Sequence, residues 1–94
     1  IDALAPEPDE KVLPKTRYSG FYGTPLEKIL TDHQPDEVEV VGVCTSICVM
    51  DTVGGLANRD YRTVVPRAGV ADFDADAHQH ALLRMARLYG AIVQ

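Results

Sequence analysis

The sequence predicts an α/β fold built on a parallel sheet, and three observations indicate it. A β-branched apolar run spans 38–43, and a segment with apolar residues at helical spacing follows over 46–59. The alternation of strand and helix then repeats to the end of the chain, which predicts two right-handed crossovers between parallel strands. With 94 residues, 46% of them hydrophobic and 24% charged, the chain has the composition of one small globular domain.

The first quarter of the chain predicts little regular structure. Residues 1–10 are rich in proline and acidic side chains, as in a loop. We expect 11–13 to form a short strand that Pro14 ends, because proline cannot donate to a sheet. The aromatic and glycine-rich stretch TRYSGFYG, residues 16–23, predicts an irregular loop.

A strong helix start follows in the stretch TPLEKIL. Thr24 is expected at the N-cap and Pro25 at the first helical position, where its missing N–H costs nothing. Glu27 then completes a capping box with Thr24. We expect this helix to end over 33–36.

The later strands follow from the hydrophobic pattern. The run 38–43 alternates little, as in a strand buried on both faces, and 62–65 and 91–93 predict the next two strands. The helix between the first two strands contains Gly54 and Gly55, each of which weakens it by roughly 1 kcal/mol relative to alanine.

The last helix is predicted over 77–88. Acidic residues over 72–76 offer several N-caps, and Gly90 can close the helix in the left-handed conformation. The expected core face of this helix consists of Ala77, Ala81, Leu82, Met85 and Leu88.

Both cysteines lie where a strand leads into a helix, in the stretch VVGVCTSICVMDT. Parallel sheets bind ligands at such carboxyl ends. Cys48 falls in the expected first helical turn, where free N–H groups and the helix dipole favour a nucleophilic thiolate. Cys44 lies one turn earlier, and we expect its backbone N–H to point into the same space. From position alone, two packed thiols and a reactive thiol fit equally well, a disulfide would distort the turn, and a zinc site lacks a second ligand pair.

The net charge of −5, without a basic run, argues against nucleic acid or an anionic membrane surface as a partner. No apolar run is long enough to span a bilayer, and no signal-peptide pattern is visible, so we expect a cytoplasmic protein. The cluster Asp72, Asp74, Asp76, His78 and His80 fits an acidic helix start followed by exposed histidines better than a metal site.

Several segments together resemble the isochorismatase-like cysteine hydrolases, the superfamily of the nicotinamidases. VVGVCTSICVMDT resembles the family's nucleophile segment, an apolar strand followed by Gly-Val-Ala-Thr-Asp-x-Cys-Val and a helix. KTRYSGFYGTPLEKIL resembles the family block Lys-x-Arg-x-Ser-x-Phe-x-Gly-Thr-x-Leu. YRTVVPRAGVADFD and HALLRMARLYGAIV resemble the closing strand, loop, helix and strand, and the order and spacing agree over nearly the whole chain.

The resemblance implies roles for single residues. Cys48 matches the nucleophile, and Lys15 matches the lysine of the family's Asp-Lys-Cys triad, although most lysines are simply solvated at the surface. The backbone N–H groups of Cys44 and Cys48 match the oxyanion hole, and the Val43–Cys44 peptide matches a bond that is cis in the family. Cys44 occupies a position where the family often has alanine, so only its backbone is expected to act.

Tyr18 and Phe21 match a loop beside the substrate pocket of the family. Three positions depart from the family pattern. Ser46 replaces a frequent aspartate, Asp60 stands where glycine is usual, and Arg67 stands where aspartate is usual. Aspartate tolerates the left-handed conformation that a glycine position often requires, so Asp60 remains compatible with the pattern.

The resemblance also implies a missing part. The family fold is a three-layer α/β/α sandwich with a parallel sheet of strand order 3-2-1-4-5-6, and residues 1–94 match its later half, the C-terminal part of one domain. The triad aspartate, and the ligands of a divalent metal such as zinc, belong to the unmatched part. We therefore expect no cofactor bound by this chain alone, an N-terminal half or partner chain that completes the fold, and, as in relatives, a homo-oligomer.

The implied activity is cleavage of the C–N bond of a small-molecule amide through a thioester on Cys48. The presence of this cysteine favours amide hydrolysis over the ether cleavage of true isochorismatases. Two other functions stay open: a non-enzymatic α/β binding or assembly module on the same scaffold, and a thiol redox protein that uses Cys44 and Cys48. The hydrolase predicts one hyper-reactive thiol, the module two inert thiols, and the redox protein reversible loss of both.

Overall fold

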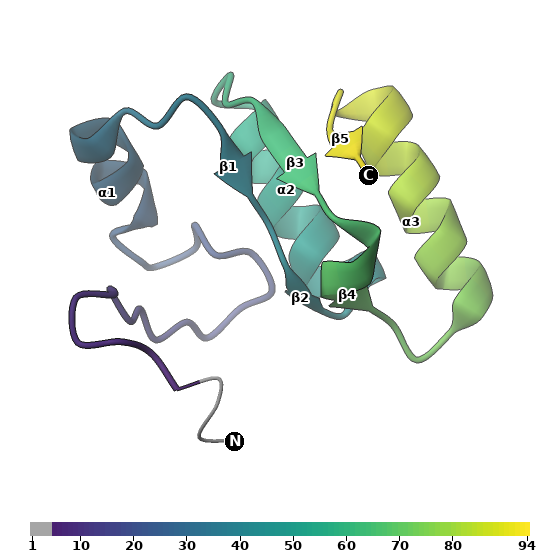
Figure 1. Cartoon of the computed structure of the whole chain (residues 1–94), viewed down its shortest axis with the longest axis horizontal. Coiled ribbons are helices and arrows are strands. Elements are labelled where there is room, and N and C mark those ends of the chain that lie inside the picture. Colours follow the sequence, from purple (N-terminus) through teal and green to yellow (C-terminus); the bar gives the residue numbers. More distant parts are fainter. Residues whose placement is uncertain (1–4) are drawn as a thin grey trace.

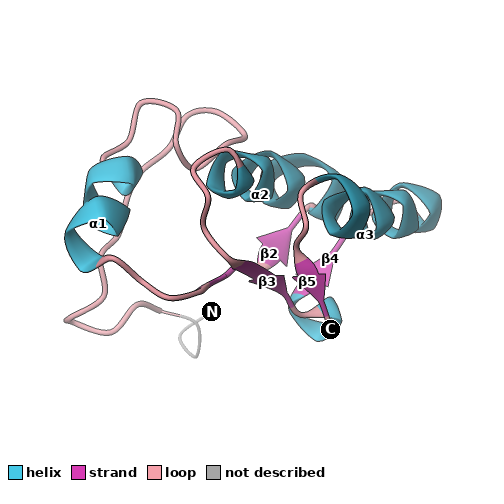
Figure 2. Ribbon diagram, turned by 90° about the horizontal axis from the view of Figure 1, so that it is seen from above, coloured by secondary structure: helices cyan, strands magenta, loops and turns pink. Residues whose placement is uncertain are grey.

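In the computed structural model, which describes residues 5–94, short parallel strands carry helices α2 and α3 on one face (Figures 1 and 2). The elements in order are α1 (Leu26–His33), β1 (Val38–Glu39), β2 (Gly42–Val43), a π-helical turn (Thr45–Val49), α2 (Met50–Ala57), β3 (Thr63–Val65), a 3₁₀ turn (Arg67–Gly69), β4 (Val70–Ala71), α3 (Ala75–Leu88) and β5 (Ile92–Val93). All strand pairs are parallel, in the orders β1-β3-β5 and β2-β4, which confirms the predicted α/β class. Among residues 5–94, α2 and α3 lie on the same face of the sheet, so the helical layer on the other face remains a prediction.

The central strand β3 forms the middle of the core. Its three residues are buried and β-branched, which suits a pleated surface that is covered on both sides. β1 pairs with one edge of β3 and β5 with the other. The main apolar cluster joins the strands to α2 and α3 and consists of Val49, Val53, Val65, Val70, Ala81, Leu82, Met85 and Ala91.

Helix α3 begins two residues earlier than predicted, because Asp74 is its N-cap. The Asp74 carboxylate accepts the N–H groups of Asp76 and Ala77 at 2.9 and 3.2 Å, which satisfies donors that the first turn leaves free. Gly90 follows with a φ of +68°, as predicted for the residue that closes the helix. Leu88 was expected in the core and is 60% exposed, because no other described element covers that side of the last turn.

The N-terminal segment contains one wrong prediction. Residues 5–10 and 16–23 are irregular, as predicted, while 1–4 lie outside the described residues. The short strand expected over 11–13 is absent. Val12 is 67% exposed there, and a strand forms only where a neighbouring strand accepts its hydrogen bonds.

Helix α1 lacks the predicted capping box. It begins at Leu26, Pro25 occupies the N-cap position, and the Thr24 hydroxyl accepts the Leu26 N–H at 3.3 Å. Glu27 does not reach back to Thr24, because its carboxylate accepts a hydrogen bond from Arg59 Nε at 3.0 Å. A long-range ion pair to Arg59 therefore takes the place of the predicted capping hydrogen bond of Glu27.

The strand predicted over 38–43 is split in two, because Val40 and Val41 separate β1 from β2. Gly42 begins β2 with a φ of +135°, which favours glycine. Its expected burial on both faces is also wrong, since Val41 and Val43 are 57% and 65% exposed. β1 is an edge strand among residues 5–94, so one side of this segment has no neighbouring strand. β4, which pairs with β2, was not predicted, because a strand of two residues has no measurable period.

Within the described residues, no helix combines the length and the hydropathy that a bilayer crossing requires.

Two substitutions on α3 test the corrected core. Met85 is fully buried, so Met85→Ala should lower the free energy of unfolding by about 2–5 kcal/mol in urea denaturation of the natural protein. Leu88→Ala is the matched control and should change it by about 0.5 kcal/mol or less. Equal losses from both substitutions would show that the last turn of α3 is covered after all.

Candidate active site

Cys48 lies in the π-helical turn Thr45–Val49 rather than in the first turn of an α-helix. The Cys44 carbonyl accepts the N–H groups of Ile47 and Val49 at 3.1 and 3.2 Å, so the turn is wider than an α-helical one. The Val43–Cys44 peptide bond that precedes it is cis. Both cysteines are free, half-buried thiols, so the structure contains no disulfide between them.

Lys15 is brought to Cys48 from 33 residues earlier in the chain. Its Nζ lies 3.7 Å from Cys48 Sγ and donates to the carbonyl oxygen of Arg17 at 2.9 Å. Lys15 is exposed, but its amino group is not simply solvated. The thiolate is the nucleophilic form of cysteine, and the Lys15 amino group is within hydrogen-bonding reach of the sulfur.

A surface hollow opens at this pair. It is lined by Lys15, Thr16, Arg17, Tyr18 and Cys48. Tyr18 therefore lies where the family resemblance expects a substrate contact. Phe21, which carried the same expectation, does not line this hollow.

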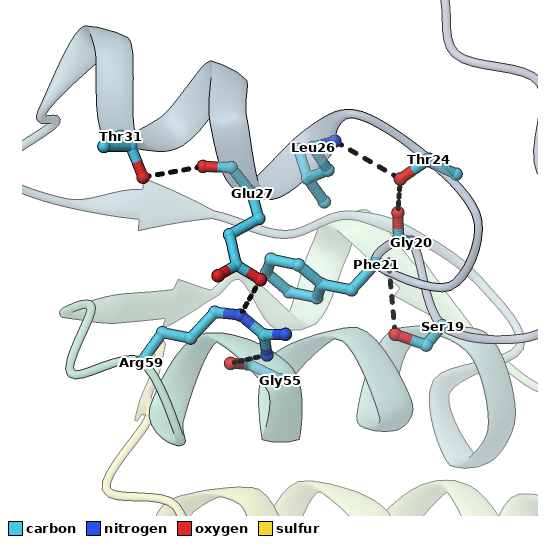
Figure 3. A network of polar contacts seen from close by, with 9 residues as sticks. All are labelled: Ser19, Gly20, Phe21, Thr24, Leu26, Glu27, Thr31, Gly55 and Arg59. Carbon is cyan, nitrogen blue, oxygen red and sulfur yellow. Dashed lines mark hydrogen bonds and ion pairs between the residues drawn. The ribbon is translucent and has the colours of Figure 1, made fainter.

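Phe21 instead fastens the loop to α2 (Figure 3). The Arg59 guanidinium carbon lies 4.0 Å from the centre of its ring, a cation–π contact. The ring also covers Gly55 so closely that a Cβ at that position would lie 2.5 Å from it. Arg59 completes the contact by bonding Glu27 and the Gly55 carbonyl. The sequence analysis did not predict this role for Phe21.

Polar contacts hold the same loop at a second point. The Gly20 N–H donates to Thr52 Oγ1 on α2 at 2.9 Å. The Thr24 hydroxyl donates to the Gly20 carbonyl (Figure 3). The Phe21 N–H donates to Ser19 Oγ at 3.1 Å. The loop that carries Lys15 is therefore docked on the helix that follows Cys48.

A second group of contacts reaches the π-helical turn from the segment between β4 and α3 and from α3 itself. Asp72 Oδ2 accepts both the N–H and the hydroxyl of Ser46, at 2.8 and 2.5 Å. His78 Nδ1 lies 2.8 Å from the hydroxyl of Thr45, which is completely buried. His78 is thus half-buried and bonded, and its expected exposure is wrong, whereas His80 is exposed as expected.

These contacts explain the acidic run after β4. Asp74 caps α3 and Asp72 binds the π-helical turn, so each carboxylate has a structural role. Within residues 5–94, no three His, Cys, Asp or Glu side chains are placed to share an ion. Two features of the sequence bear on the contact between Asp72 and Ser46: the cap-rich acidic run that contains Asp72, and the serine at position 46 where the family usually has aspartate. The sequence analysis treated these two features separately and did not predict the contact.

The pKa of the Asp72 carboxyl is lowered from 3.8, first because the Ser46 hydroxyl donates to it and then because the Ser46 N–H does. The folded-state pKa thus lies below that of the unfolded chain. Ionised Asp72 therefore stabilises the fold above about pH 3.8, and this contribution is lost as the pH falls through the folded-state pKa.

Comparison with known proteins identifies the family. The Isochorismatase domain matches residues 1–94. The isochorismatase family protein PncA of Bacillus subtilis (strain 168) is 42% identical over 87 residues, which cover 93% of this chain and 48% of that protein. The chain therefore belongs to the isochorismatase family.

Solved structures confirm the fold. The nicotinamidase SaPncA from Staphylococcus aureus superposes with a TM-score of 0.85 at 43% identity, over 87% of this chain and 53% of that one. The N-carbamoylsarcosine amidase from Thermoplasma acidophilum gives a TM-score of 0.87 at 37% identity, over 100% and 53% of the two chains. The chain spans about half the length of these relatives.

The contact between Asp72 and Ser46 can be tested by NMR titration of the Asp72 carboxyl carbon. We expect a pKa below 3.8 in the natural protein, and Ser46→Ala should move it upward, since the hydroxyl is the largest cause of the shift. Ser46→Ala should also make the free energy of unfolding decrease less steeply as the pH falls below about 3.8. Ser19→Ala, which removes a hydroxyl elsewhere, is the control. A pKa at or above 3.8 in the unsubstituted protein would contradict the contact.

A double-mutant cycle tests the docking of the loop. Gly55→Ala favours the helix by about 1 kcal/mol but places a Cβ against the Phe21 ring. We expect it to destabilise the natural protein in urea denaturation when Phe21 is present. In a Phe21→Ala background the same substitution should be neutral or stabilising. Identical effects in the two backgrounds would show that the ring does not pack on Gly55.

Proposed function

We propose that this chain carries the nucleophile of a cysteine hydrolase that cleaves the C–N bond of a small amide. The observation that supports it is the approach of Lys15 Nζ to within 3.7 Å of Cys48 Sγ, at the carboxyl end of a parallel strand. The names of the related structures support the reaction class, since one is a nicotinamidase and another an N-carbamoylsarcosine amidase.

In the first half of the proposed reaction, the Cys48 thiolate attacks the amide carbonyl carbon, and the carbonyl oxygen becomes an oxyanion. The backbone N–H groups of Cys44 and Cys48 donate to this oxyanion. The C–N bond then breaks, the departing amine takes a proton from the Lys15 ammonium, and a thioester on Cys48 remains.

In the second half, water attacks the thioester carbonyl. Its proton passes back to Lys15, the C–S bond breaks, and the acid leaves with Cys48 again a thiolate. Amide and water are thereby converted into acid and amine, with both residues returned to their starting state. In the hollow, Tyr18 and Arg17 are the side chains next to Cys48 that a substrate would meet.

A further strand is proposed to complete the site. Two adjoining hollows follow the free edge of β1 and β2, and their shared lining includes Val40, Val41 and Thr52. An apolar strand that pairs there would cover Val41 and Val43, which are exposed in residues 5–94. It would come from an N-terminal half of the same domain or from a partner chain, and would bring the carboxylate of the triad. A homo-oligomer also remains a prediction.

A divalent metal such as zinc does not fit the residues described. The acidic and histidine side chains near the site are engaged in capping and in contacts to the turn, so any metal ligands belong to the proposed additional part. No step of the proposed reaction is assigned to a metal.

Substitution of the two residues in contact tests the proposal in the complete natural protein, with ammonia release from nicotinamide and from N-carbamoyl compounds as the assay. Cys48→Ala should lower kcat by about 10³-fold or more. Lys15→Ala should lower it by about 10²–10⁴-fold, the usual contribution of a group that moves protons. Lys11→Ala, an exposed lysine of the same segment, is the matched control.

Cys44→Ala separates the hydrolase from the redox protein. It keeps the backbone N–H, so the hydrolase predicts a loss of less than about tenfold. A redox protein would need both thiols and would lose its function equally with either substitution. Absence of amide hydrolysis, with both cysteines slow to react, would favour the binding or assembly module.

A further inference from the structure

The π-helical turn is held by two consecutive residues that the proposed chemistry does not use. Ser46 gives both its N–H and its hydroxyl to Asp72 Oδ2, at 2.8 and 2.5 Å. The hydroxyl of Thr45, completely buried, lies 2.8 Å from His78 Nδ1. Asp72 lies between β4 and α3, and His78 lies on α3, 26 and 33 residues after their respective partners.

Asp72 and His78 are themselves fixed in place. Asp72 Oδ1 accepts the Asp74 N–H at 3.3 Å, and Asp74 in turn caps α3. His78 lies on α3 and its N–H donates to the Asp74 carbonyl at 2.9 Å. The two side chains therefore connect the turn to the N-terminal end of a fourteen-residue helix packed in the core.

These contacts determine the direction of the backbone around Cys48. A peptide unit is planar, so fixing the Ser46 N–H also fixes the Thr45 carbonyl. The contact between His78 and the Thr45 hydroxyl fixes Thr45, the residue before Ser46. The N–H of Cys44 lies one residue before this pair and that of Cys48 two residues after it, and an oxyanion hole works only when its donors already point at the developing charge.

We propose that Asp72 and His78 are positioning residues that hold Thr45 and Ser46 so that the N–H groups of Cys44 and Cys48 face the oxyanion. The proposal rests on the proposed hydrolase function. The positioning role differs from the role of Lys15, which comes from the N-terminal loop and acts on the sulfur atom of Cys48. Loss of the positioning pair should weaken stabilisation of the oxyanion and leave formation of the thiolate intact.

Two reactions of the same thiol separate these effects. Acylation by an amide needs both the thiolate and the oxyanion hole. Alkylation of Cys48 by iodoacetamide needs the thiolate but forms no oxyanion. The ratio of the two rates is therefore a readout that a general loss of structure does not reproduce, because unfolding would change both.

The experiment compares Asp72→Ala and His78→Ala with the unsubstituted natural protein in kcat, KM and the alkylation rate of Cys48. We expect each to lower kcat by about 10–100-fold, as a small misplacement of catalytic groups does, with KM and alkylation unchanged. Asp72→Asn and His78→Asn keep a polar atom in place, so we expect them to lower kcat less than the alanine variants do, again with normal alkylation. Asp76→Ala and His80→Ala, exposed on the same helix, are the matched controls.

Each outcome decides one question. Unchanged kcat in the alanine variants of an active protein would overturn the positioning role alone. A parallel fall of kcat and alkylation would overturn it too, because the pair would then serve only the fold. If the alanine variants do not fold, the two asparagine variants test the positioning role. A fall in their kcat with normal alkylation supports the role. The role is overturned if both rates are fully retained although NMR spectra show that the hydrogen bond to the turn is broken. Absence of amide hydrolysis in the unsubstituted protein would refute the proposed function itself, and the positioning role with it.

Discussion

The structure depends on one constraint: the turn that carries Cys48 must be rigid on one side and open on the other. Thr45 at its start is completely buried, while Cys48, three residues later, is half-buried beside a hollow. A wide π-helical turn meets both needs, because it leaves the strand β2 directly and continues into α2. The buried end joins the core between the sheet and α3. The open end is where a ligand can approach, as expected at the carboxyl end of a parallel strand.

Two distant segments meet at this turn and act on different atoms. The N-terminal loop brings Lys15 to the sulfur, and its position is set by the Phe21 ring on Gly55 and by the bond from Gly20 to Thr52. The β4–α3 segment reaches the backbone of the turn through Asp72. The Lys15 amino group and the backbone of the turn are thus held by separate contacts, to α2 and to the segment that leads into α3. The ion pair between Arg59 and Glu27 lies at the surface and adds little energy by itself.

The sequence predicted what short-range patterns determine and missed what long-range contacts determine. The parallel α/β order, the acidic cap of α3 and the left-handed Gly90 follow from periodicity and local backbone preference. Asp60, with a φ of +64°, likewise occupies a left-handed position as the family pattern suggested. The exchange of the capping box for an ion pair between Glu27 and Arg59 could not be predicted, because it joins residues far apart in the chain. The Asp72–Ser46 and His78–Thr45 contacts were missed for the same reason, and no pattern indicates that Phe21 turns toward Gly55.

The most direct test of the account is the rate at which iodoacetamide labels each thiol near neutral pH, read by peptide mass spectrometry in the natural protein. The contact between Lys15 and Cys48 predicts that Cys48 reacts about tenfold or more faster than Cys44, and that Lys15→Met removes most of the difference. Equal, slow labelling of the two thiols, unchanged by Lys15→Met, would contradict the claim that this pair forms an activated nucleophile. The chain would then carry the scaffold of its family without the chemistry.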